Sequence, residues 1–195
     1  MAITNSKSLA LYGGTFDPIH HGHLILARDA MEQLGIEKVI FLPAKISPFK
    51  LDTPPSPPET RLDMIKAAIQ PDAGFAVDDR ELRRQGPSYT IETVREYRAE
   101  FPATHLFFLI GDDNLPNLGE WKESSELAKL VEFVILGRMG IAEVDAYRVV
   151  SRKIEISSTE IRRRVAQGLP IHHLVPHGVL EIIRSRRLYL NPSWK

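Results

Sequence analysis

Eleven consecutive residues at positions 13–23, GGTFDPIHHGH, have types and spacing that suit the binding of a phosphate group. The two leading glycines let the backbone come close to a ligand, and a helical pattern begins at Gly22. The N-terminus of that helix would present unpaired N–H groups and the positive end of a dipole. His20 and His23 are three residues apart and can face one ligand, whereas His21 should point elsewhere. A nearby polyphosphate would raise the imidazole pKa above about 6.5, so that each ring could donate to developing negative charge.

The same segment could instead be an ordinary junction between a strand and a helix, with solvated histidines. That alternative is stronger for any one of these residues, but the whole set of matched positions favours a phosphate site. The segment has neither the GK[ST] end of a Walker loop nor the third glycine of the GxGxxG fingerprint. It is similar to the signature of the nucleotidyltransferases whose loop ends in HxGH or TxGH, and it most resembles that of bacterial nicotinate-mononucleotide adenylyltransferases. The resemblance assigns catalysis to His20 and His23, and it assigns ATP binding to Gly13, Gly14, Thr15, Phe16, Asp17 and Gly22.

Apolar runs alternate with helical patterns along the chain, which predicts an α/β fold with a parallel, doubly wound sheet. Strands are expected at 8–12, 38–42, 75–77, 105–110 and 133–136, and helices at 22–34, 58–69, 91–101, 124–130, 158–167 and 177–186. Ligands of such sheets bind at the carboxyl ends of the strands, where Gly13, Pro43, Gly111 and Gly137 fall. We expect a single Rossmann-like domain over residues 1–195.

Length and composition exclude several other classes of protein. With 195 residues, of which 43% are hydrophobic, the chain can bury the core of one globular domain. Lys+Arg and Asp+Glu total 25 each, so the net charge is zero and creates no field that would attract nucleic acid or an anionic membrane. The absence of cysteine excludes disulfides and thiolate metal sites, and the sequence shows no signal-peptide or membrane-spanning pattern. We therefore expect a cytoplasmic protein that binds anions locally, without nucleic acid or a membrane as a partner.

A second helix start with phosphate-binding residue types is predicted at 156–162, ISSTEIR. Serine and threonine at the capping positions and glutamate in the first turn make a good N-cap, which is the structural alternative. The same hydroxyl groups followed by an arginine also make a second phosphate clamp. The segment resembles the ISSTxIR motif of the same adenylyltransferases. The resemblance assigns catalysis to Arg162 and ATP binding to Ile156, Ser158 and Thr159.

The segment 43–58 holds six of the 14 prolines and is too long for a tight connection between a strand and a helix. It is either a functional loop or a tolerated insertion. PAK at 43–45 and PFK at 48–50 resemble the family loop that often ends in PHK, with Phe49 in place of histidine. The resemblance places Lys50 near the phosphates and Lys45 near the mononucleotide, and the alternative is two solvated lysines.

Two further segments resemble the part of the family's site that binds the pyridine ring. SYT at 88–90 matches a segment whose threonine, here Thr90, helps to hold the pyridine carboxylate, although it could equally cap a helix. GDDNLPNLGEW at 111–121 matches the pattern GADxLxxLxxW with Asp112 in place of alanine. Trp121 would stack on the nicotinate ring or, alternatively, belong to the core.

The resemblance also assigns three residues near the strand ends to ATP. Gly111 and Asp113 follow a predicted strand, and the Asp113 carboxylate could accept hydrogen bonds from ribose hydroxyls. Residues 137–140, GRMG, resemble an xRPG turn that retains Arg138 but has Met139 in place of proline, so the turn is less constrained. Asp112 has no role that the sequence suggests.

Taken together, the resemblance implies transfer of the adenylyl group of ATP to nicotinate mononucleotide, giving nicotinate adenine dinucleotide and pyrophosphate in NAD biosynthesis. Mg2+ would bind through the ATP phosphates and water, without a metal site of protein ligands. Another HxGH enzyme, such as pantetheine-phosphate adenylyltransferase or a cytidylyltransferase, and a non-catalytic nucleotide sensor are the alternatives. A preference for nicotinate over nicotinamide rests on the resemblance alone, and a homo-oligomer stays open.

Overall fold

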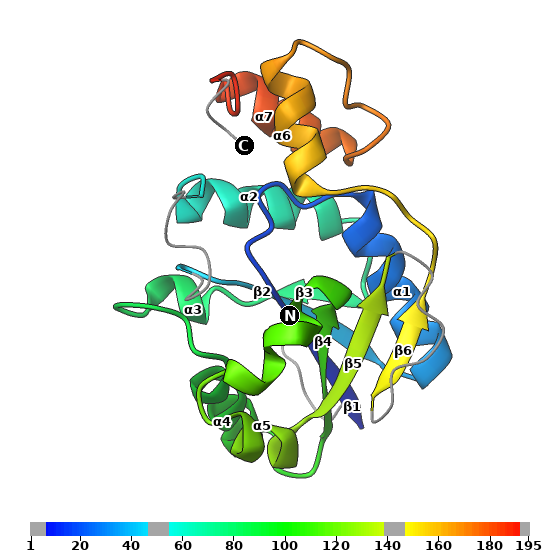
Figure 1. Ribbon diagram of the computed structural model, residues 1–195, viewed down its shortest axis with the longest axis vertical. Coiled ribbons are helices and arrows are strands. Elements are labelled where there is room, and N and C mark those ends of the chain that lie inside the picture. The colour runs from blue at the N-terminus through cyan, green and yellow to red at the C-terminus, as the bar shows by residue number, and fades with distance from the viewer. Residues whose placement is uncertain (1–6, 47–54, 139–146, 192–195) are drawn as a thin grey trace.

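Six parallel strands form one sheet at the centre of the protein (Figure 1). The computed structural model describes residues 7–46, 55–138 and 147–191. The strands are β1 (Ser8–Gly14), β2 (Lys38–Pro43), β3 (Phe75–Val77), β4 (His105–Gly111), β5 (Glu132–Gly137) and β6 (Arg148–Ser151). Their order in the sheet, β3-β2-β1-β4-β5-β6, is that of the dinucleotide-binding folds. The predicted parallel α/β sheet is therefore confirmed.

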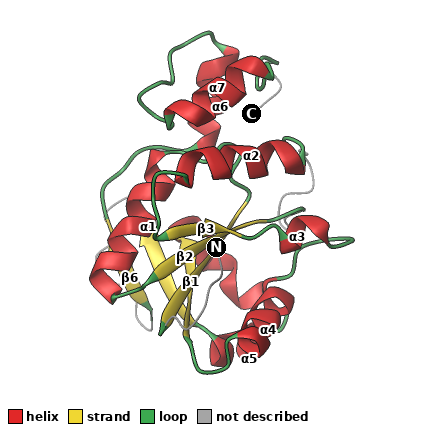
Figure 2. Cartoon of the chain, turned by 180° about the vertical axis from the view of Figure 1, so that it is seen from behind, coloured by secondary structure: helices red, strands yellow, loops and turns green. Residues whose placement is uncertain are grey.

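Helices cover both faces of the sheet (Figure 2). They are α1 (His21–Leu34), α2 (Pro58–Ile69), α3 (Arg80–Arg83), α4 (Thr90–Glu100), α5 (Ser124–Leu130), α6 (Ser158–Ala166) and α7 (His177–Ser185), together with the 3-10 helix η1 (Asp112–Glu120). One core layer joins α1, α2 and α7 to the sheet, and the other joins α4 and α5 to its opposite face. The sheet is therefore doubly wound, as predicted. Within the described ranges, no helix combines the length and the apolar character that crossing a membrane requires.

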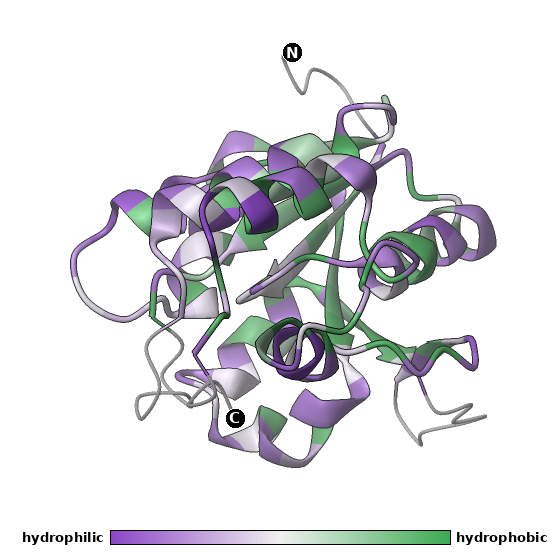
Figure 3. Ribbon diagram, turned by 90° about the horizontal axis from the view of Figure 1, so that it is seen from above, coloured by the Kyte–Doolittle hydropathy of each residue, from purple (hydrophilic) through white to green (hydrophobic). Residues whose placement is uncertain are grey.

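Alternation along β1 shows why the chain needs two core layers. Ala10 and Tyr12 pack into the layer that contains α1 and α2, whereas Leu9 and Leu11 pack into the layer that contains α4. All four side chains are buried. Because a central parallel strand is covered on both faces, its sequence is apolar without interruption. Figure 3 shows the same arrangement, with hydrophobic ribbon along the strands and hydrophilic ribbon on the outer sides of the helices.

Three elements, α3, η1 and β6, depart from the sequence-based expectation. The helix α3 has four residues, too few for a helical pattern to be recognised. The strand β6 lies at the edge of the sheet, and Val150 is its only buried residue, so its sequence lacks a long apolar run. In η1, Leu115 and Leu118 recur three residues apart, which is the period of a 3-10 helix.

The helices α6 and α7 lie beside α2 at one end of the protein (Figure 1). Arg186 donates a hydrogen bond to the Thr60 hydroxyl at 3.0 Å and forms an ion pair with Asp63 at 2.6 Å. The buried Tyr189 donates its hydroxyl proton to the Asp17 carboxylate, across 172 residues of chain. These bonds hold the C-terminal helices against α2 and against the phosphate loop, residues 13–17.

Candidate active site

The carboxyl ends of the central strands open into one cavity of about 970 Å³. Gly13 and Gly14 end β1, Gly111 ends β4, and Arg138 follows β5 directly. The order of the strands reverses between the neighbours β1 and β4, which is the position at which ligands bind to doubly wound sheets. The volume lies at the upper end of the range for small-molecule sites, so the cavity can accept a ligand of nucleotide size.

The phosphate loop leaves β1 in a conformation that its sequence explains. Phe16 has a φ of 50°, in the left-handed region that residues with a side chain seldom occupy. Its ring folds back onto Gly14, where a Cβ atom would lie 2.8 Å from the ring carbon Cζ. The ring also contacts Tyr12 and His23 edge-on, with centroid distances of 5.4 and 5.1 Å. Packing alone therefore requires glycine at position 14.

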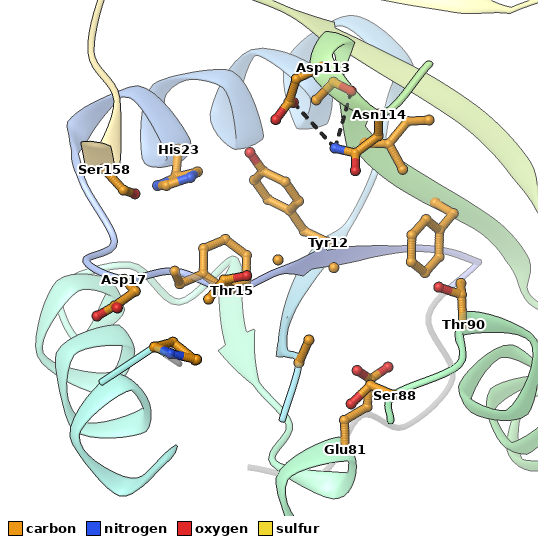
Figure 4. Close-up of a pocket in the computed structure, with 18 of the residues that line it drawn as sticks. Tyr12, Thr15, Asp17, His23, Glu81, Ser88, Thr90, Asp113, Asn114 and Ser158 are labelled. Atoms are coloured by element: carbon orange, nitrogen blue, oxygen red, sulfur yellow. Dashed lines mark hydrogen bonds between the residues drawn. The ribbon is translucent and has the colours of Figure 1, made fainter. Parts of the chain in front are cut away.

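The two predicted catalytic histidines stack on each other, with 3.7 Å between their ring centroids and 23° between their planes. His23 lines the cavity, and Figure 4 shows its ring between Ser158 and Tyr12. His20 is fully buried and is not part of the cavity wall. Neither ring nitrogen of His20 has a hydrogen-bond partner within the described residues. The expectation that both imidazoles face one ligand therefore holds for His23 and not for His20.

The surroundings of the two rings keep them neutral in the free protein. Burial lowers the pKa of His20 to about 3, with a further contribution from the charge of Arg138. Burial, His20 and Arg138 also lower the pKa of His23 well below its usual value. The Nδ1 atom of His23 accepts a hydrogen bond from the backbone N–H of His20 at 3.2 Å, so the proton of the neutral ring resides on Nε2. The rise in the pKa of these imidazoles that is expected from the sequence applies to the complex with a polyphosphate and not to the free protein.

The helix α1 begins at His21, one residue earlier than expected, and N–H groups of its first turn already have partners. The N–H of His21 donates to the carbonyl of Leu174 at 3.0 Å, and the N–H of His23 donates to that of His20 at 3.0 Å. Gly22 is not part of the cavity wall, and a Cβ atom there would lie 3.1 Å from Nδ1 of His20. Gly22 therefore packs against His20, and its contact with a phosphate stays a prediction.

The two predicted phosphate-binding segments meet, although they are about 140 residues apart in the chain. Ser158 Oγ donates to the carbonyl of Pro18 at 2.9 Å. Arg162 donates from Nη1 to the carbonyl of Asp17 at 2.8 Å and from Nη2 to the hydroxyl of Thr159 at 3.3 Å. Ser158, Thr159 and Arg162 all line the cavity. One wall of the cavity therefore combines the phosphate loop with the start of α6.

The capping interpretation of ISSTEIR is correct as well. The Ser157 hydroxyl accepts a hydrogen bond from the backbone N–H of Glu160 at 3.1 Å, so this serine is the N-cap of α6. Ile156 is partly buried against the hydrophobic core and does not line the cavity, and its place in ATP binding stays a prediction. The capping bond fixes the start of the helix, and thereby the positions of the four residues that line the cavity, Ser157, Ser158, Thr159 and Arg162.

Asp17 lies in the cavity wall, but its carboxylate is turned into the protein. One oxygen accepts from the backbone N–H of Ser56 at 3.0 Å, and the other accepts from the Tyr189 hydroxyl. Burial and the charge of Asp17 raise the pKa of Tyr189, so its hydroxyl remains a donor. The side chain is only 4% exposed. Asp17 therefore supports the phosphate loop and Arg162, and its negative charge is directed away from an anionic ligand.

Two neighbouring carboxylates hold Arg138 at the end of β5. Asp112 accepts from the Arg138 backbone N–H at 3.1 Å, and its other oxygen lies 3.7 Å from Nε. Asp113 pairs with Nη2 of the same guanidinium at 3.0 Å and accepts from the Asn114 amide at 3.2 Å (Figure 4). A Cβ atom at Gly111 would lie 2.4 Å from the Asp113 carboxylate, so this arrangement requires glycine there. Asp112 thus positions Arg138.

Aromatic residues and a helix start form the opposite end of the cavity. Trp121 lies edge-on to Phe108 and Phe133, with centroid distances of 6.1 and 6.3 Å. It also lines the cavity, so both of its predicted roles, core residue and cavity wall, apply. Thr90 is the first residue of α4 and faces the cavity with its hydroxyl (Figure 4). This end can hold a flat ring against Trp121 and offer a hydroxyl to a polar substituent.

Lys45 connects this end of the cavity to the segment that contains Ser88. Its backbone N–H donates to the Ser88 hydroxyl at 3.0 Å, and its Nζ donates to the carbonyl of Arg84 at 2.7 Å. Glu81, which also lines the cavity, accepts from the Thr93 hydroxyl at 2.7 Å and is bonded to Ser88. Burial raises the pKa of Glu81. This network of hydrogen bonds holds the SYT segment, residues 88–90, in place at the wall of the cavity.

Comparison with known proteins places this cavity in a family. The Cytidylyltransferase-like family model matches residues 11–164, which contain both phosphate-binding segments. A relative from Methylacidiphilum infernorum is 43% identical over 96% of this chain and 94% of its own length, and one from Opitutus terrae is 43% identical over 93% and 97%. Both are named "Probable nicotinate-nucleotide adenylyltransferase". The chain belongs to the nicotinate-nucleotide adenylyltransferase family.

Solved structures share the fold of this chain. The nicotinic acid mononucleotide adenylyltransferase of Plasmodium falciparum, complexed with NaAD, superimposes with a TM-score of 0.76 over 94% of this chain and 97% of its own. The same enzyme complexed with APC gives a TM-score of 0.74. The sequence identity is 20% in both cases, so this likeness concerns the fold.

Most residues that were predicted from the adenylyltransferase motifs do line the cavity. They are Gly13, Gly14, Thr15, Phe16, Asp17, His23, Lys45, Thr90, Gly111, Asp113, Trp121, Arg138, Ser158, Thr159 and Arg162. Lys50, Phe49 and Met139 lie outside the described residues. The wall also includes Tyr12, Glu81, Phe108 and Asn114, which the sequence does not single out. Tyr12 and Phe108 are parts of apolar strands and resemble core residues, and Glu81 lies in the unexpected helix α3.

Proposed function

We propose that this chain transfers the adenylyl group of ATP to nicotinate mononucleotide, giving nicotinate adenine dinucleotide and pyrophosphate, a step of NAD biosynthesis. One observation carries the proposal: a single cavity joins a wall of phosphate-binding groups to a wall that suits a pyridine ring. Thr15, His23 and Arg162 belong to the first wall, and Thr90 and Trp121 belong to the second. The curated relatives carry the name of this activity.

The reaction requires alignment and charge stabilisation, and no protein nucleophile. An oxygen of the mononucleotide phosphate attacks the α-phosphorus of ATP, and the bond from that phosphorus to the departing pyrophosphate oxygen breaks. His23 would donate from Nε2, and Arg138 would bring a positive charge held by two carboxylates. The Nε atom of Arg162 is buried and has no partner in the described part of the chain, so it retains a donor for a phosphate oxygen.

Mg2+ would reach this cavity with the triphosphate. The described residues contain no cluster of three or more histidine or carboxylate side chains that could hold a metal ion. The carboxylates of the cavity wall nearest to the phosphate-binding groups, Asp17 and Asp113, already accept hydrogen bonds from protein groups. This donor set fits a hard cation that keeps several water ligands and binds phosphate oxygens. The ion supplies neutralising charge to the triphosphate when it is bound.

Selection of the acid over the amide is the finer part of the proposal. The cations Lys45 and Lys122 line the pyridine end, together with the Thr90 hydroxyl. Glu81, whose pKa is raised by burial, is directed at protein groups, because it accepts a hydrogen bond from the Thr93 hydroxyl at 2.7 Å. These features favour a carboxylate on the ring over a neutral amide.

The decisive experiment measures pyrophosphate release from ATP and Mg2+ with each of three acceptors: nicotinate mononucleotide, nicotinamide mononucleotide and pantetheine phosphate. We expect the highest kcat/KM with nicotinate mononucleotide, and stoichiometric formation of nicotinate adenine dinucleotide. If pantetheine phosphate gave a higher kcat/KM than nicotinate mononucleotide, it would be the acceptor and the proposal would be wrong. Binding of ATP without turnover of any acceptor would identify a nucleotide sensor instead.

A further inference from the structure

Arg61 is a fully buried arginine at a position where a charge is doubly unfavourable. It is the fourth residue of α2, near the positive end of the helix dipole. Removal of a guanidinium from water costs several kcal/mol unless the protein replaces its hydrogen bonds. Burial accordingly lowers the pKa of Arg61, and the charge of Asp17 acts in the opposite direction. An arginine remains charged under these conditions, so the surroundings must compensate for it.

The compensation consists of four hydrogen bonds to backbone carbonyls in three segments. Nε donates to Ser56 at 3.0 Å, and Nη1 donates to Thr15 and Ala44, both at 2.8 Å. Nη2 donates to Lys45 at 3.3 Å. Thr15 belongs to the phosphate loop, Ala44 and Lys45 follow β2, and Ser56 precedes α2. Three of these four acceptors belong to residues that line the cavity.

The acceptors of the four Arg61 hydrogen bonds are neutral carbonyls, so no carboxylate pairs with the guanidinium directly, and the charge of Asp17 offsets only part of its positive charge. A second bond supports the same junction, since the N–H of Ala44 donates to the carbonyl of Gly14 at 2.9 Å. The guanidinium therefore lies behind the phosphate loop and links it to the segment that follows β2. Sequence spacing does not reveal this role, because the acceptors lie up to 46 residues away.

We propose that Arg61 is a positioning residue that sets the spacing of the phosphate loop from the segment after β2, and that its charge attracts the triphosphate to this end of the cavity. The proposal rests on the proposed function insofar as the ligand is a triphosphate. Lysine cannot set this spacing, because its single ammonium nitrogen cannot reach all four carbonyls that the three guanidinium nitrogens of Arg61 contact. Lysine can still attract the triphosphate, because it retains the positive charge.

A matched control exists at the opposite end of the sheet. Arg98 in α4 also donates to backbone carbonyls, those of Thr104 and Leu130. It does not line the cavity. Loss of its guanidinium should therefore reduce stability without an effect on the reaction.

The test compares R61M, R61K and R98M with the wild-type protein. Calorimetry measures the Kd of inorganic pyrophosphate, steady-state assays measure kcat and KM for ATP, and thermal unfolding measures Tm. R61M should raise the Kd of pyrophosphate about tenfold, as expected for the loss of an attraction of about 1.4 kcal/mol between a positive charge and an anion near the protein surface. It should also lower kcat about 10- to 100-fold through displacement of the phosphate loop. R61K should keep the Kd within about threefold of wild type but lower kcat at least tenfold, and R98M should lower only Tm.

Three results would overturn the proposal: kinetic constants of R61M within twofold of wild type, full kcat in R61K, or unchanged binding of pyrophosphate by R61M. If R61M does not fold, R61K decides the matter alone, because it retains the buried charge. The pyrophosphate measurement does not depend on turnover. A wild-type protein that forms no dinucleotide would therefore refute the proposed function, whereas unchanged pyrophosphate binding in R61M would refute the role of Arg61.

Discussion

Replacement of His23 by alanine should remove one N–H donor from the phosphate end of the cavity. Because Nδ1 of His23 accepts from the His20 backbone, the Nε2 proton is the one available to a ligand. Loss of a single donor that stabilises charge in a transition state lowers kcat about 10²- to 10³-fold, equivalent to about 2.7–4 kcal/mol. The KM for ATP should change much less, because this charge develops only as the α-phosphorus is attacked.

The same substitution should have little effect on stability, because the His23 ring is partly exposed to the cavity. A loss of about 1 kcal/mol in the free energy of unfolding would lower Tm by about 2–4 °C in a chain of this size. His21→Ala is the matched control, since that residue is two positions away in the same helix and does not line the cavity. Its kcat should equal that of the wild-type protein.

The assay follows pyrophosphate release with both nucleotides at saturation, and ATP is then varied to obtain KM. A His23→Ala protein whose kcat lies within threefold of wild type would refute the assignment. A large rise in KM with unchanged kcat would also contradict it, because it would show that His23 binds the ground state and the transition state equally.

Three further predictions concern a residue of the cavity wall and two residues that lie behind it. The pKa of His20 is about 3 in the folded protein and about 6.5 in the unfolded chain, so between about pH 6 and pH 3 only the unfolded chain binds a proton at this residue. His20 should therefore lower the free energy of unfolding by about 1.4 kcal/mol for each unit by which the pH falls in this range. Urea denaturation of His20→Asn should show a correspondingly weaker pH dependence, and an identical one would contradict the burial of a neutral imidazole. Trp121→Ala should raise the KM for the mononucleotide about tenfold, as expected for loss of stacking worth about 1–3 kcal/mol. An equal rise in the KM for ATP would show that the indole does not stack on the pyridine ring alone. Asp112→Ala should raise the KM for ATP about fivefold, because Arg138 loses a hydrogen bond worth about 1 kcal/mol; an unchanged KM would show that Arg138 keeps its position without it.

The parts of the fold that could be predicted from the sequence depend on neighbouring residues. The run SLALY predicts a buried strand, and glycine with a following helical pattern predicts the turn after it. The start of α6 was predictable for the same reason, because Ser157 caps the helix that it begins. The alternation of strands and helices predicted a parallel, doubly wound sheet, whereas the order of its strands is known only from the structure.

The parts that could not be predicted depend on contacts between distant residues. No motif in the sequence singles out Arg61, and only its carbonyl partners explain its complete burial. Asp112 acquires a role through Arg138, 26 residues further along the chain. His20 matches the motif but lies behind His23, because helical spacing determines which residues share a side and not which of them reaches the surface.

The bond between Tyr189 and Asp17 also has a consequence for the synthesis of the protein. It joins two points 172 residues apart, and a ribosome that adds about 5–20 residues per second needs on the order of ten seconds to cover that length. Until residue 162 has been added, the growing chain contains the phosphate loop without the complete set of Ser158, Thr159 and Arg162, and until residue 189 has been added it also lacks Tyr189. A nucleotide therefore cannot be held by the nascent chain as it is by the finished fold, and turnover begins only after the residues beyond α7 have been made.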